Sequence, residues 1–304
     1  MYKYLFSFFL LFSTLFLQGE DMTTTPQKKR FFLSACALFK NEAKYLKEWL
    51  EYHLLIGVDH FYLYNLDSSD QFMKALAPYI ERDIVTLVYW HDYIGELPSE
   101  ETFKWALGMQ IPAYENALHL RAKKETEWLV FLDVDEFLVS TAPRSIIETL
   151  KKYADFPGVT LACEYFDVSA KKNTIPKRKL LIETVELTKP PEENLQKQIC
   201  KTIFKPEHAR GFLWPPYKCL FKDEQFPIAV AKRELRINHY LHRKEGYFYA
   251  KAKPKLHIDN RMLSDEQMKE LLSLDYEIED QDRAIYRHVP ELLIRMGYDP
   301  TWGW

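Results

Sequence analysis

The segment that decides the fold is WLVFLDVDE, residues 128–136. Its first five residues are large and apolar, which indicates a buried β-strand, and the four that follow contain three carboxylic acids. In α/β proteins, ligands bind beyond the carboxyl ends of parallel strands, where these acids lie. Asp133 and Asp135 are separated by one residue, so their side chains leave the strand end in the same general direction.

The segment before this strand alternates between short strand-like and helix-like patterns. Its apolar residues either form short continuous runs or recur at helical spacing. Strands are predicted at residues 31–39, 60–65 and 84–90, and helices at residues 42–56 and from the turn at 67–70 to about residue 79. Because strands and helices alternate with short connections, we predict an α/β fold with a Rossmann-like, mostly parallel sheet flanked by helices.

Two further helices flank the acidic residues, one before them and one after them. Helices are predicted at residues 110–123 and 143–153, with Pro112 in the first turn of the former, where proline is tolerated. From residue 159 onward, strand-like runs are separated by segments rich in Pro, Lys and Glu, which indicates a mixed α+β half. Strands are expected there at residues 159–163, 180–187, 199–204 and 235–240, with helices after residue 264 and at about 282–296.

These patterns predict a single domain over residues 31–304. Its first half would cover residues 31–140, and a second half with C-terminal helices would cover residues 141–304. The chain has 304 residues, 47% of them hydrophobic, which is ample for a sizeable core.

The first 30 residues are set apart from this domain. Residues 4–17 are almost wholly apolar and follow Lys3, but the run is shorter than the roughly 20 residues that a membrane-spanning helix needs. We interpret residues 1–19 as a signal peptide or an uncleaved membrane anchor, and residues 20–30 as a polar linker. The protein is therefore expected to be exported or membrane-associated through this segment.

Charge and cysteine content narrow the function classes. The formal net charge is −3, which does not support nucleic-acid binding. The four cysteines include no CxxC pair, so a zinc site or a thioredoxin-like motif is unsupported. The sequence does not decide whether Cys200 and Cys219 form a disulfide.

The paired carboxylates suggest a metal site. Asp133 and Asp135 repel each other, and a hard divalent cation such as Mn²⁺ or Mg²⁺ relieves that repulsion. The same cation can bridge the diphosphate of a sugar nucleotide and neutralise charge on the leaving group. Asp-x-Asp alone is a weak motif, and its alternative interpretation is a solvated acidic turn.

Four separated segments strengthen the interpretation: residues 35–42 with 48–53 and 57–64; residues 128–138; residues 201–206; and residues 238–240 with Arg243 and Lys251. In their order and spacing the chain resembles glycosyltransferase family 92 (domain of unknown function 23) and related bacterial family 2-like glycosyltransferases. The resemblance covers roughly residues 31 to 255. It implies that residues 31–140 form a nucleotide-binding half and residues 141–304 an acceptor half.

This resemblance implies a GT-A-type fold and a nucleotide-sugar donor, with a UDP-sugar expected. It implies transfer of a hexosyl group, galactose among the candidates, to a hydroxyl of a glycan or lipid-linked glycan with inversion. One departure concerns residues 211–218, which lack a histidine that the family commonly has there. Contacts to acceptor or phosphate at that place are therefore in doubt.

Residue roles follow from the same match. Asp135 would ligate the metal, Asp133 would ligate it or contact the ribose, and His239 would be a third ligand or a diphosphate contact. An imidazole ligand suits Mn²⁺ better than Mg²⁺. Basic residues expected at the phosphates are Lys201 and Arg243. Residues expected near the base and ribose, from their strand-end positions, are Asn41, Glu42 and Asp67.

An inverting transfer also needs one general base to deprotonate the acceptor hydroxyl. The candidates are Glu164, Asp167, Asp223 and Glu224, and Asp167 is preferred because it follows a strand and an aromatic pair. Two other functions remain as alternatives. One is a metal-dependent phosphoesterase, which usually needs further Asp and His ligands; the other is an inactive carbohydrate-binding module on the same fold.

Overall fold

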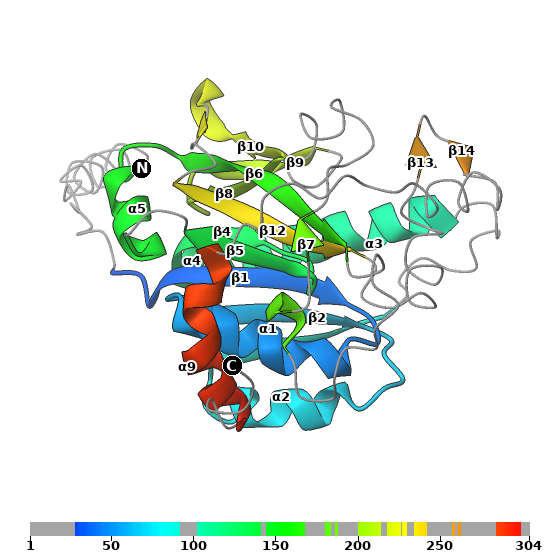
Figure 1. Ribbon diagram of the computed structural model, residues 1–304. Coiled ribbons are helices and arrows are strands. Elements are labelled where there is room, and N and C mark those ends of the chain that lie inside the picture. Colours follow the sequence, from blue (N-terminus) through cyan, green and yellow to red (C-terminus); the bar gives the residue numbers. More distant parts are fainter. Residues whose placement is uncertain are drawn as a thin grey trace, which may run out of the picture.

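The fold is one large mixed sheet with helices on both faces (Figure 1). The computed structural model describes residues 28–91, 102–140, 144–167, 180–183, 186–187, 200–213, 218–225, 227–229, 234–241, 257–258, 261–262 and 284–298. Ten strands form the large sheet, in the order β3-β2-β1-β4-β8-β6-β12-β5, with β11 and β7 both paired to β6.

The sheet strands are β1 (Phe31–Phe39), β2 (His60–Leu66), β3 (Val85–Trp90), β4 (Thr126–Phe131), β5 (Glu136–Ser140), β6 (Gly158–Asp167), β7 (Glu186–Leu187), β8 (Cys200–Phe204), β11 (Ile228–Ala229) and β12 (Leu235–Leu241). Two further pairs are β9 (Ala209–Leu213) with β10 (Lys218–Phe221), and β13 (His257–Ile258) with β14 (Arg261–Met262).

The α-helices are α1 (Ala43–Leu55), α2 (Phe72–Ile80), α3 (Thr102–Ala117), α4 (Lys123–Glu125), α5 (Ile146–Lys152) and α9 (Val289–Met296). A π-helical turn (Leu118–Ala122) joins α3 to α4. Short 3-10 helices are η3 (Leu181–Glu183), η4 (Lys222–Glu224) and η5 (Ala284–His288).

The strand directions bring the carboxyl ends of the parallel strands to one edge of the sheet. Strands β3, β2, β1 and β4 are parallel, β8 is antiparallel to both β4 and β6, and β12 is parallel to β6. The carboxyl ends of β1 to β4, β6 and β12 therefore share an edge with the start of β8 and of β5, which is antiparallel to β12. We call this edge the site edge.

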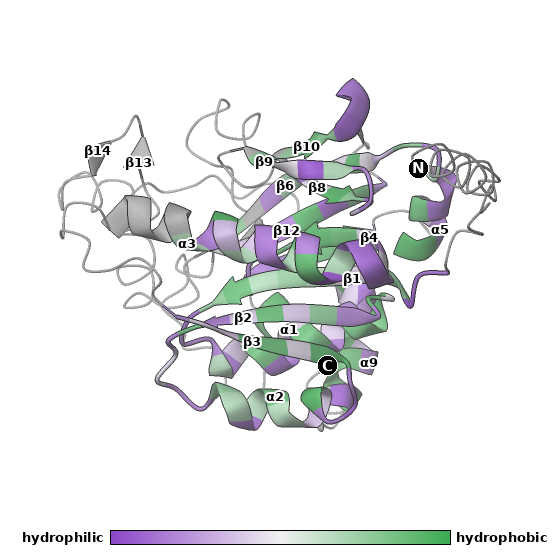
Figure 2. Cartoon of the chain, turned by 180° about the vertical axis from the view of Figure 1, so that it is seen from behind, coloured by the Kyte–Doolittle hydropathy of each residue, from purple (hydrophilic) through white to green (hydrophobic). Residues whose placement is uncertain are grey.

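The predicted fold class is confirmed: an α/β fold with a mostly parallel sheet flanked by helices, followed by a mixed second half. Strand β1 shows why helices cover both faces, because strand side chains alternate between the two faces. Leu33, Ala35 and Ala37 pack in the core beneath α1, α2 and α9. Cys36 and Leu38 pack in a second core against α3. In Figure 2, hydrophobic segments lie along the sheet strands and alternate with hydrophilic ones.

Two predicted elements are wrong in detail. The helix expected at residues 110–123 begins at Thr102, and Pro112 lies inside α3 rather than in its first turn. An interior proline removes a helical hydrogen bond at a cost of about 3 kcal/mol. Burial of Met109, Ala113 and Tyr114 against the sheet offsets that cost, and this packing is invisible in local periodicity.

The strand predicted at residues 180–187 is instead η3 followed by the two-residue β7. The cause is tertiary, since the carboxylate of Glu48 on α1 accepts the backbone N–H groups of Leu181 at 2.9 Å and Ile182 at 3.3 Å. Strand β5 was not predicted at all. It exists because it pairs with β12, which lies about a hundred residues further along the chain.

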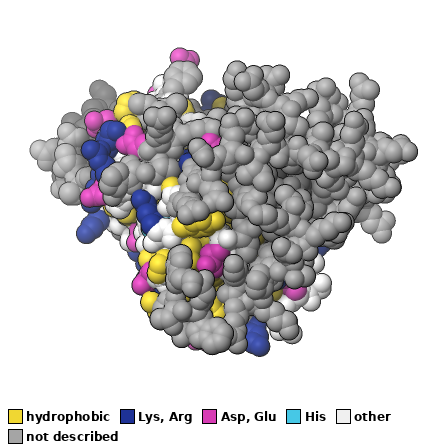
Figure 3. All heavy atoms as spheres, viewed as in Figure 1, with side chains coloured by type: hydrophobic (Ala, Val, Ile, Leu, Met, Phe, Trp, Pro, Cys, Tyr) yellow, Lys and Arg dark blue, Asp and Glu magenta, His cyan; other side chains and the backbone are white. Residues whose placement is uncertain are grey.

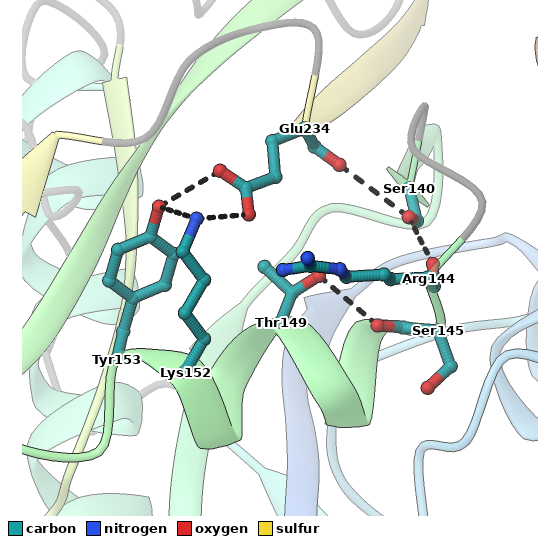
Figure 4. A network of polar contacts seen from close by, with 7 residues as sticks. All are labelled: Ser140, Arg144, Ser145, Thr149, Lys152, Tyr153 and Glu234. Carbon is teal, nitrogen blue, oxygen red and sulfur yellow. Dashed lines mark hydrogen bonds and ion pairs between the residues drawn. The ribbon is translucent and has the colours of Figure 1, made fainter.

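Helix α5 is anchored to the sheet by polar contacts at both of its ends (Figure 4). At its start, Ser140 Oγ at the end of β5 donates to the Arg144 carbonyl at 2.7 Å, and Ser145 and Glu148 form a capping box within the helix. At its end, Lys152 and Tyr153 both bind the carboxylate of Glu234, at 2.8 and 2.9 Å. Glu234 directly precedes β12, so this cluster fixes the start of the strand that carries His239.

Some expectations fall outside the described residues. They are the signal or anchor at residues 1–19, the linker at 20–30 apart from its last three residues, and the helix after residue 264. Among the residues that the structure describes, none of the helices is long and apolar enough to span a membrane. Acidic and basic side chains are interspersed at one side of Figure 3, in line with the net charge of −3.

A buried histidine in α1 makes the fold sensitive to acid. His53 is fully buried, its Nδ1–H donates to the carbonyl of Trp49 at 2.8 Å, and its Nε2 accepts the Leu138 N–H at 3.3 Å. Burial lowers the pKa of His53 from 6.5 to about 3. Below pH 6.5 the unfolded chain therefore takes up a proton that the folded chain excludes, and stability falls until about pH 3.

We expect this histidine to remove roughly 2 kcal/mol of unfolding free energy between pH 7 and pH 5. Urea unfolding of the wild type and of His53→Gln at the two pH values measures the effect, because the variant lacks the titrating ring. The variant is expected to be less stable at pH 7 yet to lose less on acidification. An equal loss in both proteins would show that His53 does not titrate as argued.

Candidate active site

The Asp133-Val134-Asp135 segment forms a turn at the site edge. The pairing of β4 with β1 continues to Leu132, whose N–H donates to the carbonyl of Cys36 at 3.0 Å. The chain then turns, with the Glu136 N–H donating to the Asp133 carbonyl at 2.9 Å, and enters β5. Asp133 and Asp135 are only 5% and 6% exposed. The alternative of a solvated acidic turn is therefore wrong.

His239 of β12 lies beside this turn, as the sequence predicted. It is opposite Glu136 in the antiparallel register of β12 and β5. Its Nε2 is 3.6 Å from Asp135 Oδ1, and its Nδ1 is 3.7 Å from Glu136 Oε1. The next residue, Tyr240, donates its N–H to the Asp135 carbonyl at 2.8 Å, which fixes β12 to the turn.

Lys201 is at the site edge but is deeply buried. It lies near the start of β8, and its ammonium forms an ion pair with Glu136; each side chain is 1% exposed. Glu136 Oε2 also accepts the Asp133 N–H at 2.7 Å. Burial raises the pKa of Glu136, the Lys201 ammonium opposes this, and the carboxylates of Asp133 and Asp135 add to it. A phosphate contact by Lys201 would require this ion pair to open.

The loops after β1 and β2 are held together at the same edge. Asn41 and Asp67 both adopt left-handed backbone conformations, with φ of 57° and 45°, which Asn and Asp tolerate better than most residues. The Asn41 N–H donates to Ser68 Oγ at 2.9 Å, and Asn41 Oδ1 accepts the Ser69 N–H at 2.8 Å. Both predicted residues are exposed, so their loops can meet a ligand.

Two neighbouring residues complete this region. The imidazole Nδ1 of His91, just after β3, lies 2.9 Å from Asp67 Oδ1. Glu42 precedes α1, where its carbonyl accepts the N–H groups of Tyr45 and Leu46. Glu42 is only 2% exposed, so its side chain is less open to a nucleotide than Asn41 is.

The structure places the general-base candidates in two different regions. Asp167 ends β6 at the site edge, opposite Leu241 in the register with β12, and Glu164 is opposite Asn238 in the same register. Asp223 and Glu224 are exposed and lie in η4, which follows β10. The two ends of the sheet thus hold different candidates.

The contacts around η4 place its two acids away from the site edge. The Lys222 N–H donates to the His208 carbonyl, and the His208 N–H donates to the Lys205 carbonyl. The Lys205 ammonium lies 5.2 Å from the centre of the Trp128 ring, near the start of β4. Asp223 and Glu224 therefore lie toward the edge of the sheet opposite Asp133.

Several expectations concern residues that the structure does not describe. Arg243 and Lys251 lie outside the described residues, as does the part of the 211–218 segment at residues 214–217. Cys36, Cys163 and Cys219 are free thiols. The disulfide between Cys200 and Cys219 is therefore not formed.

Comparison with known proteins identifies the family. The model of glycosyltransferase family 92 matches residues 29–278. The chain belongs to glycosyltransferase family 92. A family 92 protein of Oryza sativa subsp. japonica is 24% identical over 219 residues, which are 70% of this chain and 34% of that protein. The chain thus spans about a third of that relative's length.

Two other similarities are more limited. Galactan beta-1,4-galactosyltransferase GALS3 of Arabidopsis thaliana is 29% identical over 143 residues, 45% of this chain and 27% of that protein. Among solved structures, S. aureus TarS in complex with UDP is 15% identical with a TM-score of 0.37, over 80% of this chain and 70% of that chain.

The site of this family 92 chain suits a divalent cation in part. Asp135 Oδ1 and His239 Nε2 are 3.6 Å apart. Two ligands that each lie about 2.0–2.2 Å from one ion can be up to about 4.4 Å apart, so this pair fits one cation. The described residues contain no group of three His, Cys, Asp or Glu side chains placed to hold a metal. Ligation by Asp133 therefore remains a prediction.

Two residues of the family 92 site have contacts that the sequence did not reveal. Glu136 directly follows the acidic motif, but only the structure shows that it joins Asp133, Lys201 and His239. A third acid next to an Asp-x-Asp motif, followed by the apolar Phe137-Leu138, was the available signal of a buried carboxylate. His91 stood at a predicted strand end, and its partner Asp67 became visible only in three dimensions.

Proposed function

We propose that this family 92 chain is a metal-dependent glycosyltransferase. It moves a hexosyl group from a UDP-sugar to a hydroxyl of a glycan or lipid-linked glycan, with inversion. The observation that carries the proposal is the convergence of Asp135 and His239, 3.6 Å apart, beside the buried Asp-x-Asp turn at the site edge. Membership of glycosyltransferase family 92 favours this function over a phosphoesterase that uses the same acids.

In this proposal, the residues at the site edge have different binding roles. Asp135 and His239 hold the cation, which when bound neutralises charge on the leaving UDP. Asn41 and Asp67 offer polar groups to the nucleoside from the exposed loops after β1 and β2. Tyr89 of β3, 52% exposed and stacked on His91, adds an aromatic surface beside them that suits a base.

Deprotonation of the acceptor is assigned to Asp167. It ends β6, two residues beyond Tyr165, which is opposite His239 in the register of β6 and β12. Inversion requires a base that takes the hydroxyl proton on the side of the sugar away from the leaving UDP, and we assign that role to this strand end. Glu164 remains the second candidate because it lies on the same strand.

Galactose is the first sugar to examine. Two relatives are named as galactan beta-1,4-galactosyltransferases of Arabidopsis thaliana, at 29% and 27% identity over less than half of this chain. Glucose differs from galactose only in the orientation of one hydroxyl, so UDP-glucose is the matched comparison.

Thermal unfolding of the purified protein with UDP, UDP-galactose or UDP-glucose tests the donor and the metal together. We expect UDP and its galactose conjugate to raise the unfolding temperature by several degrees with Mn²⁺ present. At a ligand concentration of about 100 times Kd, binding stabilises the folded state by about 2.7 kcal/mol. With EDTA in place of Mn²⁺, the shift should disappear.

GDP-mannose with Mn²⁺ is the control for unspecific binding of sugar nucleotides. Equal shifts with and without Mn²⁺ would contradict metal dependence, and no shift with any sugar nucleotide would contradict the donor assignment. Release of UDP that depends on an added glycan would separate an active transferase from a binding module.

We further propose that the N-terminal apolar segment directs the protein to a membrane or out of the cytoplasm. The support is the composition of residues 4–17 together with Lys3. Fractionation of cells that express the full chain or a chain without residues 1–27 measures this. An identical distribution of the two proteins would contradict the proposal.

A further inference from the structure

Glu136 connects the acidic turn to His239 and Lys201. Its Oε1 faces His239 Nδ1 at 3.7 Å. Its Oε2 accepts the Asp133 N–H at 2.7 Å and pairs with the Lys201 ammonium. One carboxylate therefore binds Asp133 and Lys201 and faces His239, three residues that the family resemblance associates with the metal and the diphosphate.

The backbone of Glu136 is held as firmly as its side chain. Its N–H donates to the Asp133 carbonyl at 2.9 Å. Its carbonyl accepts the indole N–H of the fully buried Trp49 at 2.9 Å. It opposes His239 in the β5–β12 register, so a shift of Glu136 would move the turn and the imidazole together.

A carboxylate with 1% exposure is stable only when its charge is neutralised and its oxygens are hydrogen-bonded. Lys201 supplies the opposite charge, and it comes from β8, the antiparallel strand placed between β4 and β6. The ion pair thus joins the end of β4, the start of β5 and the start of β8 at one point. An arrangement that served stability alone would not require the pair to bind the Asp-x-Asp turn and face the imidazole.

We propose that the Glu136–Lys201 ion pair is a positioning device that sets the Asp133–Asp135 turn and the His239 ring for metal and donor binding. This inference rests on the proposed function. Neither residue touches the substrate. Glu136 Oε1 lies 3.7 Å from His239 Nδ1, so a proton on Nδ1 would face this carboxylate and would leave Nε2, 3.6 Å from Asp135 Oδ1, to face the cation.

The test is the double variant Glu136→Gln/Lys201→Met. Removing both charges leaves neither one buried alone, and replacing a buried ion pair with neutral groups of similar size is often harmless to folding. We expect an unfolding temperature close to that of the wild type. We expect Mn²⁺-dependent UDP binding, measured by calorimetry, to weaken about 10- to 100-fold, the range typical for loss of such a partner.

Glu48→Gln is the matched control, because Glu48 is another buried carboxylate that accepts two backbone N–H groups, from residues 181 and 182 rather than from the turn. It is expected to lower the unfolding temperature and to leave UDP binding unchanged. Binding by the double variant within twofold of the wild type would overturn the inference.

A measurement on the wild type covers the case in which the double variant does not fold. Nitrogen-15 NMR of the histidine rings, with Mg²⁺ and UDP, reports the tautomer of His239. A proton on Nδ1 supports the inference, and a proton on Nε2 overturns it.

Asp135→Asn distinguishes a failure of the proposed function from a failure of the positioning role alone. If that variant binds UDP with Mn²⁺ as the wild type does, the proposed function fails. If Asp135→Asn loses binding while the double variant retains it, only the positioning role fails.

Discussion

Asp135→Asn is expected to reduce hexosyl transfer by about 1,000-fold or more, since a bound cation contributes several kcal/mol to leaving-group stabilisation and each 1.36 kcal/mol changes the rate tenfold. The amide keeps the size of the side chain but lacks the charge that binds a cation. Because Asp135 is 6% exposed and its carbonyl accepts the Tyr240 N–H, the backbone of the turn should persist in the variant. Steady-state rates with UDP-galactose and Mn²⁺ measure the effect.

The control for this variant is Asp155→Asn. Asp155 is exposed in the connection between α5 and β6, so the same chemical change there should leave the rate within twofold of the wild type. Activity of Asp135→Asn within tenfold of the wild type would contradict a metal-binding role for this residue. Higher Mn²⁺ concentrations should recover part of the activity if the remaining defect is weak cation binding.

Trp49→Ala is expected to lower the free energy of unfolding by about 3–5 kcal/mol, the cost of deleting a large core side chain. Trp49 is fully buried in α1, and its ring lies 5.3 Å from that of Phe61 and 4.7 Å from that of His53. The deletion also removes the hydrogen bond that its indole N–H donates to the Glu136 carbonyl at 2.9 Å. Urea unfolding monitored by circular dichroism measures the loss.

Trp49→Phe separates the two contributions, because it keeps most of the ring volume and loses only the indole N–H. Its cost should be about 1–3 kcal/mol, that of leaving a buried carbonyl without its donor. Ile294→Ala on α9 is the control, since Ile294 is 55% exposed and its truncation should change stability by less than about 0.5 kcal/mol. A loss below about 1 kcal/mol for Trp49→Ala would contradict the packing argument.

The parallel half of the sheet could be predicted from the sequence because its signals are local. Strands β1, β2 and β3 are continuous apolar runs, and the helices between them have apolar residues at helical spacing. The same local signals failed at η3 and in α3. Glu48 determines the backbone of residues 181–183 from a helix far away in the chain, and core packing allows Pro112 inside a helix.

The candidate site, too, could be predicted from the sequence only in part. The Asp133-Val134-Asp135 motif could be found because it directly ends an apolar strand, and His239 could be proposed through the family resemblance. Lys201 was correctly placed at the site edge, but its contact is the Glu136 carboxylate. Asp223 and Glu224 looked equivalent to Asp167 as acids near strands, and only the position of η4 separates them.

The sequence by itself determined the α/β class, the strand that carries the acidic motif and the family. These depend on residue patterns within short segments, where side-chain periodicity reports which face is buried. Only the tertiary structure decided that β8 lies between β4 and β6, that β5 pairs with β12, and that Glu136 joins Lys201 to the turn and to His239. The physical reason is that strand order brings together charges far apart in the chain, and a buried carboxylate is stable only where such a partner arrives.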